Sequence, residues 1–345
     1  MYSISPPARF CPLINMPESN VKNQHYVPQA YLRFFAKKSE QVWVYDKSSG
    51  KKFSANIRNV ASEKYFYDSA TLEKVTGQRQ FIEKRLSSLE GRYSEVCKAL
   101  IKNLQSGEFK YISPSMRHFF SVYLVVQMLR TKEHRIHIKQ HTETLAALIQ
   151  QRYVKEGLPP PSTEQLTQGQ SIDDLSQELQ NTKLLDGSVI EEFSLILYRH
   201  IWIIQEAFKD QQFLTSDHPF VKTPHVKHPW RSMSGIRSLG IEILFPLSPK
   251  YILTLVERTH FGGLTPFDGK RLRMTSSENM VYCNQFQIYQ SNRFLFSQNG
   301  NFDFAEEILR EEPIHGNIDR VRLATNHDEE LRRADGVHRS QLLNL

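Results

Sequence analysis

The stretch QHYVPQ, residues 24–29, places a histidine just ahead of a proline and an aromatic segment. A residue that precedes proline is pushed toward an extended conformation, so Val27 should be extended and the chain should turn into a helix after it. His25 would then stand at a turn before that helix. An imidazole in such a place could act as a general base or acid, and Tyr26 beside it could contact a substrate. The alternative is a histidine that only hydrogen-bonds to the loop backbone.

An amide and a guanidinium at helical spacing form the second candidate, in QMLRTKEHR. Gln127 and Arg130 are three residues apart and would share one helix face at the end of an apolar run. The planar fork of arginine suits a phosphate or a carboxylate. The alternative is an internal ion pair with Glu83 or Glu90, which are seven residues apart and therefore on one face of their own helix. Both interpretations could hold, since an ion pair can also orient a catalytic group.

Two further stretches, FLTSDHPF and YCNQFQIYQSNRF, add carboxylate, hydroxyl and amide groups. Ser216 and Asp217 follow a predicted strand, where they could shape a turn, or where Ser216 could donate a hydrogen bond and Asp217 could act as a base or metal ligand. Asn284, on a predicted helix, and Arg293, at the next element, could contact a substrate. A satisfied core amide is the simpler interpretation of Asn284.

The chain lacks the short motifs that identify common catalytic sites. It has no phosphate-binding GxxxxGK[ST] loop, no GxGxxG after a strand, no HExxH and no GxSxG. The histidines of HRIHIKQH, at positions 134, 137 and 141, include an i,i+4 pair that could bind zinc. Because Arg130, Lys132, Arg135 and Lys139 in the same segment would repel a cation, we interpret it as a basic helix that faces solvent or an anion.

The order of predicted elements is typical of an α+β protein, with an N-terminal β-hairpin, long central helices and a C-terminal, mostly antiparallel sheet. The apolar patterns predict a hairpin over 41–57, an aromatic knot at 65–67, helices over 78–106, 114–155, 172–185 and 276–290, strands around a turn over 197–220, a strand pair over 241–248 and 251–257, and a last strand over 293–297.

Length and composition predict one large domain. The chain has 345 residues, of which 39% are hydrophobic, enough for a sizeable core. We expect a single α+β domain over residues 23–310 with a proline-rich loop at 157–171. Residues 1–22 should form a flexible tail rather than a signal peptide, and residues 311–345 a charged, solvated tail.

The net charge and the cysteines of the chain indicate which binding partners and which cellular compartment to expect. The net charge of +7 would suit nucleic acid or a nucleotide, or is simply spread over the surface. Cys11, Cys97 and Cys283 show no pairing pattern, which fits a reducing cytoplasm and argues against disulfides and structural zinc. No apolar run reaches the roughly 20 residues of a membrane span, so we expect no membrane partner. The oligomeric state stays open.

Taken together, these motifs resemble an uncharacterised, mainly bacterial family, number 4238 among the domains of unknown function. Its members open with His-Tyr-Val-Pro followed by a Tyr-Leu-Arg-x-Phe helix, as residues 25–35 do here. The likeness continues through VWVYDK, NVASEKYFY, IEKRLSSLE, QMLRT, LTSDHPF and FPLSP to Asn284 and the strand after it, over roughly residues 23–297. The chain departs from the family pattern at Lys132, where proline is common, and at His218, where asparagine is usual. The resemblance supplies no settled reaction, but it implies that the polar residues of these motifs belong to one arrangement.

A phosphodiesterase, most simply a nuclease, is the leading hypothesis. His25 would be the general base or acid, and Arg130 would stabilise phosphate charge. Asp217 and Glu83 would hold a divalent cation such as Mg²⁺ or Mn²⁺, or would orient His25; the spacing leaves both roles and the need for a metal open. A non-catalytic nucleotide- or nucleic-acid-binding protein is the alternative, and a third interpretation makes the motifs structural and places the function in partner contacts. An open cleft shared by His25, Arg130 and Asp217 would favour the first two interpretations; separate buried positions would favour the third.

Overall fold

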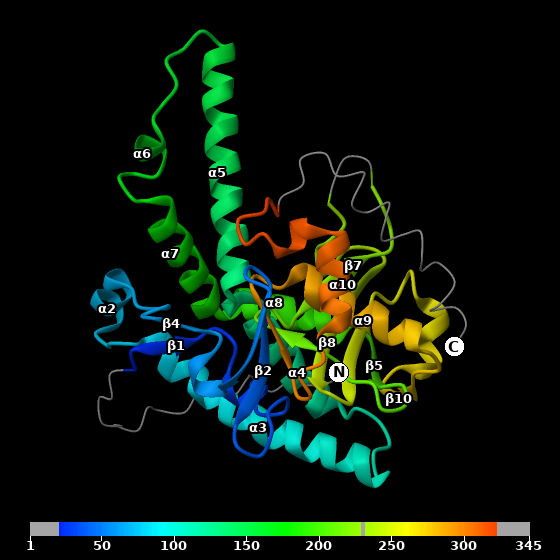
Figure 1. Cartoon of the computed structure of the whole chain (residues 1–345). Helices are drawn as coiled ribbons and strands as arrows, with labels where there is room; N and C mark the ends of the chain where they lie inside the picture. Colours follow the sequence, from blue (N-terminus) through cyan, green and yellow to red (C-terminus); the bar gives the residue numbers. More distant parts are fainter. Residues whose placement is uncertain (1–20, 229–231, 323–345) are drawn as a thin grey trace, which may run out of the picture.

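The protein is seen here in a computed structural model that describes residues 21–228 and 232–322 (Figure 1). The fold is α+β, as predicted. Most of the expected N-terminal tail, together with Cys11, and the later part of the expected C-terminal tail lie outside these residues. In the described part of the chain, no helix is both long and apolar enough to cross a membrane.

The N-terminal motif forms a short strand and a short helix around the proline. Strand β1 (Asn23–His25) pairs antiparallel with β4 (Ser62–Lys64), and α1 (Gln29–Leu32) follows directly after Pro28. His25 therefore ends a strand just before a helix, as the proline predicted. The hydroxyl of Tyr31 on α1 lies 2.6 Å from Thr215 Oγ1 and donates to the carbonyl of Pro246 at 2.8 Å, which ties the motif to strands of both larger sheets.

A four-stranded antiparallel sheet joins the two ends of the domain. The predicted hairpin of β2 (Gln41–Asp46) and β3 (Lys51–Asn56) is confirmed. Strand β11 (Phe294–Ser297) lies between β2 and the two-residue β6 (Thr215–Ser216), in the order β3-β2-β11-β6. This non-local pairing brings the turn after β6 beside the start of β11.

The larger sheet carries much of the core. Its order is β10-β5-β9-β8-β7, and only the pairing of β10 with β5 is parallel. Strands β5, β8 and β9 are buried along their whole length, which explains their continuous apolar runs. The bounds are β5 (Ile201–Glu206), β7 (Val221–Pro224), β8 (Ile241–Ser248), β9 (Tyr251–Val256) and β10 (Lys270–Arg273).

Helices surround the sheets, and one of them stands out from the body. In Figure 1, α5 rises away from the sheets and α7 runs beside it, with α6 in the proline-rich connection. The helices are α2 (Ala70–Thr76), α3 (Phe81–Ser106), α4 (Pro114–Arg130), α5 (Lys132–Lys155), α6 (Thr163–Leu166), α7 (Ile172–Leu185), α8 (Gly187–Tyr198), α9 (Ser277–Gln290) and α10 (Asp303–Glu311), with 3-10 turns at Ile57–Asn59, Gly262–Phe267 and Pro313–Gly316.

The single helix predicted over 114–155 is wrong, because the chain breaks at Thr131. This residue is extended, with ψ of 155°, and its hydroxyl caps α5 by accepting the backbone N–H of His134 at 3.3 Å. The same hydroxyl lies 2.8 Å from His218 Nδ1. A buried contact with a distant segment thus fixes a break that helical periodicity alone does not reveal. The sequence pattern does not predict helix α8, whose last residues fall in the strand predicted from residue 197.

The prediction of a solvated tail from residue 311 is wrong for its described part. Arg320 is buried, and the side chain of Arg322 is 4% exposed. Arg322 Nε donates to Glu133 Oε1 at 2.6 Å, and Arg320 Nη2 lies 3.5 Å from the same oxygen. These residues look like a charged tail in sequence because the buried carboxylate that pairs with them is far away in the chain.

Candidate active site

Arg130 lies at the centre of a buried polar cluster where α4 ends. Its side chain is 1% exposed. The guanidinium pairs with Glu90 Oε1 on α3 at 2.7 Å, donates from Nε to the hydroxyl of Tyr67 at 3.2 Å, and donates from Nη2 to the backbone carbonyl of His25 at 2.6 Å. The ion pair expected from helical spacing is therefore confirmed with Glu90. One side chain holds together α3, β1 and the segment after β4.

His25 presents a neutral imidazole to this cluster. Burial is the main cause that lowers the pKa of the ring, and the charge of Arg130 lowers it further; Glu90 and backbone hydrogen bonds at Arg58 and Ile57 oppose the shift. The ring nitrogen Nε2 is buried and has no hydrogen-bond partner within the described part of the chain. A neutral imidazole with a free nitrogen is the form in which histidine accepts a proton.

The pKa of Glu83, which lies two helical turns before Glu90 on α3, is shifted upward, whereas the pKa of His25 is shifted downward. Burial raises the pKa of its carboxyl to about 7, Glu90 and Asp68 raise it as well, and Arg130 opposes them. Its Oε2 is buried without a hydrogen-bond partner among the described residues. A large part of this carboxyl is therefore protonated near neutral pH, so Glu83 can donate a proton where His25 can accept one.

Gln127 adds a third unsatisfied atom to the cluster. Its Nε2 donates to the carbonyl of Tyr26 at 3.4 Å, and its buried Oε1 has no partner in the described structure. Buried polar atoms in folded proteins are nearly always hydrogen-bonded, so each exception needs an explanation. Several exceptions lie around Arg130: His25, Glu83 and Tyr123 interact electrostatically with its charge, Asn181 bonds to the backbone of Tyr67, and Gln127 lies one helical turn before it on α4. The cluster therefore has the features expected of a binding or catalytic site.

The raised pKa of Glu83 predicts a pH-dependent stability. The carboxyl binds its proton more tightly in the folded chain than in the unfolded chain. The contribution of the protonated carboxyl to the free energy of unfolding is therefore complete below pH about 4.5 and is lost as pH rises through about 7. We expect the free energy of unfolding of Glu83→Gln to fall by up to about 3 kcal/mol less than that of the wild type over this pH range. Urea unfolding of both proteins at several pH values measures the difference. The same pH dependence of the unfolding free energy in both proteins would contradict the raised pKa of Glu83.

Asp217 lies in a different environment from Glu83. Its buried carboxylate accepts the backbone N–H groups of Asn292, Arg293 and Phe294 at 2.8 to 2.9 Å, which clamps the turn after β6 to the start of β11. Burial raises the pKa of this carboxyl, although these hydrogen bonds and Lys47 oppose the shift. With its oxygens directed at backbone donors, Asp217 is poorly placed to share a metal ion with Glu83. Over residues 21–228 and 232–322, no group of three or more histidine, cysteine, aspartate or glutamate side chains could hold a metal ion.

A family model described as "Protein of unknown function (DUF4238)" matches residues 23–301, most of the chain. The chain belongs to the DUF4238 family. The predicted resemblance is thus confirmed, and the match runs from β1 to just after β11. No curated protein and no solved structure matches the chain.

The DUF4238 motifs supply both the cluster around Arg130 and a second, structural set of contacts. Ser216 Oγ donates to Gln287 Oε1 at 2.7 Å and accepts the backbone N–H of His218 at 3.2 Å. Asn284 accepts the N–H of Leu214 at 2.8 Å through Oδ1 and donates from Nδ2 to a nearby carbonyl. These contacts favour the interpretation of Asn284 as a satisfied core amide, and they give Ser216 a similar role.

Tyr26 and Arg293 lie between the two sets. Arg293 forms a two-pronged ion pair with Asp46, at 2.9 and 2.7 Å, and its side chain is 42% exposed. Burial raises the pKa of Tyr26, as does the charge of Asp217, whereas Arg293 lowers it. The predicted residues therefore converge in part. His25, Glu83, Gln127 and Arg130 form one cluster, and Asp217 belongs to the neighbouring clamp.

Tyr67 is a functional candidate that the sequence motifs do not single out, although the predicted aromatic knot at 65–67 includes it. Its hydroxyl donates toward the carbonyls of His25, at 3.3 Å, and Arg130, at 3.2 Å, and it accepts from the guanidinium. Gln24 holds it in place by accepting the N–H of Tyr67 at 2.6 Å and donating to Asp68. The available signal is the position of Gln24 directly before the motif that begins at His25, inside the matched range.

Proposed function

We propose that the protein is a hydrolase that cleaves a phosphodiester, most simply in nucleic acid, and that His25 and Glu83 are its base and acid. The observation that carries the proposal is that His25 and Glu83, which both interact with the buried charge of Arg130, each keep a buried polar atom without a partner in the described structure. Environments that push the pKa values of two groups of one site in opposite directions are typical of acid–base catalysis, and Arg130 interacts with both His25 and Glu83. The net charge of +7 favours an anionic substrate.

The reaction assigns one step to each group. His25 Nε2 would take a proton from water as the water oxygen bonds to phosphorus, and Glu83 would give its proton to the oxygen that leaves. Arg130 would stabilise the negative charge that develops on the phosphoryl oxygens, and Gln127 Oε1 would orient the attacking water. Glu90 and Tyr67 would act as positioning residues, because they hold the guanidinium.

Two observations bear on the setting of this activity and on the main alternative. The described cysteines, Cys97 and Cys283, are unpaired, which is the usage expected in a reducing compartment such as the cytoplasm. The burial of Arg130, whose three guanidinium nitrogens all have partners inside the protein, and the separate position of Asp217 favour the interpretation in which the motifs are structural and the function lies in partner contacts. A non-catalytic binding protein would instead bind a nucleotide or nucleic acid at the unpartnered atoms without turnover.

Turnover of labelled RNA and DNA, with and without Mg²⁺ or Mn²⁺, tests the proposal. We expect the wild type to cleave at least one substrate, and His25→Ala or Glu83→Gln to lower kcat about 10²–10⁴-fold, because each removes a proton-transfer group. His118→Gln, which replaces an exposed histidine elsewhere on the chain, serves as the matched control and should keep full activity.

The outcomes separate the hypotheses. Cleavage that persists unchanged in both variants would contradict the assignment of base and acid. Ligand binding without turnover by the wild type, lost in Glu83→Gln, would favour the binding protein. Circular dichroism of each variant ensures that lost activity does not reflect lost folding.

A further inference from the structure

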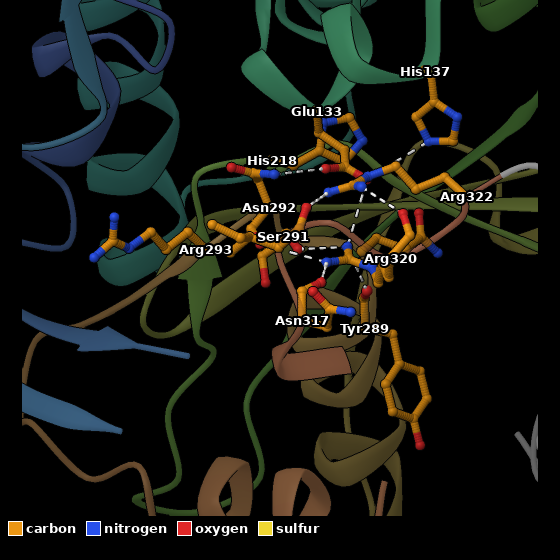
Figure 2. A network of polar contacts seen from close by, with 12 residues as sticks. Glu133, His137, His218, Tyr289, Ser291, Asn292, Arg293, Asn317, Arg320 and Arg322 are labelled. Atoms are coloured by element: carbon orange, nitrogen blue, oxygen red, sulfur yellow. Dashed lines mark hydrogen bonds and ion pairs between the residues drawn. The ribbon is translucent and has the colours of Figure 1, made fainter. Parts of the chain in front are cut away.

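The last described segment of the chain is held against the domain by two arginines. Residues 317–322, called here the arginine segment, form neither a helix nor a strand, yet the side chains of Arg320 and Arg322 are only 7% and 4% exposed. Figure 2 shows both guanidinium groups directed toward Glu133, at the start of α5, beside the turn that carries Ser291. The proposed hydrolase uses none of these contacts.

One side-chain amide recognises the backbone of the arginine segment. Gln140 lies two helical turns after Glu133 on α5. Its Nε2 donates to the carbonyl of Arg320 at 3.0 Å, and its Oε1 accepts the backbone N–H of Arg322 at 2.8 Å. A bound peptide is often recognised in this way, with affinity from main-chain hydrogen bonds and specificity from the sites that receive its side chains.

The first arginine caps the C-terminal end of α9. Arg320 Nη2 donates to the carbonyls of Tyr289, at 3.2 Å, and Ser291, at 2.8 Å. The last carbonyls of a helix have no partner within the helix and carry the negative end of its dipole, so a cation with several N–H donors is favoured there. The Ser291 carbonyl also accepts from Lys47 Nζ at 2.9 Å, so the helix end keeps one cation when Arg320 leaves.

The second arginine neutralises a buried carboxylate. Arg322 Nε donates to Glu133 Oε1 at 2.6 Å, and Asn292 Nδ2 donates to Oε2 at 3.3 Å. Burial alone would raise the pKa of Glu133, but Arg322 and Arg320 lower it, so the carboxylate is ionised at neutral pH.

This carboxylate has no equivalent counter-ion elsewhere in the described part of the chain. Apart from the two arginines, His137 is the only basic side chain within 4 Å of Glu133 in residues 21–228 and 232–322, at 3.7 Å. Burial lowers the pKa of this imidazole to about 4, so it is neutral at physiological pH. Because a buried carboxylate without a counter-ion is costly, the site around Glu133 requires a positively charged occupant.

The two arginines and the residues that bind them belong to different parts of the chain. Glu133, Gln140 and Ser291 lie inside the range matched by the DUF4238 model, residues 23–301, whereas the arginine segment lies beyond it. The matched domain thus contributes a carboxylate, a backbone-binding amide and a helix end, and the segment that follows it contributes the cations. A site built in this way can be filled by any segment that presents two arginines at the same spacing.

We propose that Glu133, Gln140 and the C-terminal end of α9 form a docking site for a segment of another protein with the pattern Arg-x-Arg. The charge of the site fits this partner, because a carboxylate and a helix C-terminus both favour cations. The arginine segment is then the resident occupant that the partner must displace. Since a tethered ligand has an effective concentration in the millimolar range, it excludes weak partners. The docking site does not depend on the proposed hydrolase.

Fluorescence anisotropy with a labelled peptide of residues 313–322 tests the docking site. In the full chain that carries both Arg320→Met and Arg322→Met, the resident segment loses the two cations that hold it. This double variant should bind the peptide at least about tenfold more tightly than the wild type does, because the wild type must first release its own segment. A peptide with one glycine inserted between the arginines keeps the charge but changes the spacing, and it should bind about tenfold more weakly.

Two further substitutions in the double variant locate the bound peptide. Glu133→Ala should abolish binding, because it removes the carboxylate, whereas Glu156→Ala, at an exposed ion pair, is the matched control and should leave binding unchanged. Circular dichroism checks that each variant folds. If the double variant does not fold, Arg322→Met alone, in which Arg320 keeps its contacts, should still bind the peptide more tightly than the wild type does.

The outcomes decide whether the site takes a separate partner. Binding by the folded variants that is no tighter than binding by the wild type would overturn the proposal, and so would equal binding of the two peptides. A wild-type dimer that is lost in the double variant, measured by analytical ultracentrifugation, would assign the site to the arginine segment of a second copy and would also overturn it.

Discussion

Arg130→Met is expected to lower the free energy of unfolding by about 3–5 kcal/mol, the usual cost of breaking a buried ion pair by removing one partner. Methionine nearly matches the apolar stem of arginine but loses all the hydrogen bonds of the guanidinium. The change would leave Glu90, the hydroxyl of Tyr67 and the carbonyl of His25 without their main donor. Because these groups come from three separate segments, the loss should loosen all of them.

Urea unfolding measures this cost, with Arg152→Met as the matched control. Arg152 also pairs with a glutamate, but its side chain is 79% exposed, so its replacement should cost no more than about 1 kcal/mol. The loss of unfolding free energy in Arg130→Met should clearly exceed the loss in Arg152→Met. A loss below about 1 kcal/mol at Arg130 would show that the guanidinium does not hold the cluster together.

Glu133→Ala has the second large expected effect, also about 3–5 kcal/mol, since it strips two buried arginines of their shared carboxylate. Arg320 and Arg322 would keep their backbone acceptors but would lose the carboxylate that they share. The described end of the chain should then detach from α5. Limited proteolysis would detect that release, and urea unfolding would give its energy.

A double-mutant cycle with Arg322→Met separates this ion pair from other roles of Glu133. In the Arg322→Met background, Glu133→Ala should cost much less, because part of the buried positive charge is already gone. Glu156→Ala removes the carboxylate of an exposed ion pair and is the control, since such a pair contributes little to the free energy of unfolding. Equal costs of Glu133→Ala in both backgrounds would mean that the two side chains are not coupled.

Local patterns predicted most of the fold. The hairpin of β2 and β3, the pair β8 and β9, and the bounds of α7 follow from residue types within each segment, and the structure confirms them. The break at Thr131 and the burial of Arg320 do not follow from local patterns. Each depends on a partner far along the chain, His218 in the first case and Glu133 in the second.

In the candidate site, too, some contacts follow from local sequence patterns and others depend on segments far apart in the chain. Helical spacing was enough to expect that Arg130 would meet a glutamate on the neighbouring helix, and the resemblance placed His25 in the same arrangement. The clamp at Asp217 could not be predicted, because it exists only where the turn after β6 meets the start of β11. That meeting is set by sheet order, which residue patterns do not encode.

The pH dependence of turnover tests the central claim most directly. If neutral His25 is the base and protonated Glu83 the acid, kcat/KM should rise as His25 loses its proton, at a pH below its usual pKa, and fall as Glu83 loses its proton near pH 7. The residual turnover of Glu83→Gln should lack the fall. A flat wild-type profile from about pH 6 to about pH 9, or a fall that persists in Glu83→Gln, would contradict the account.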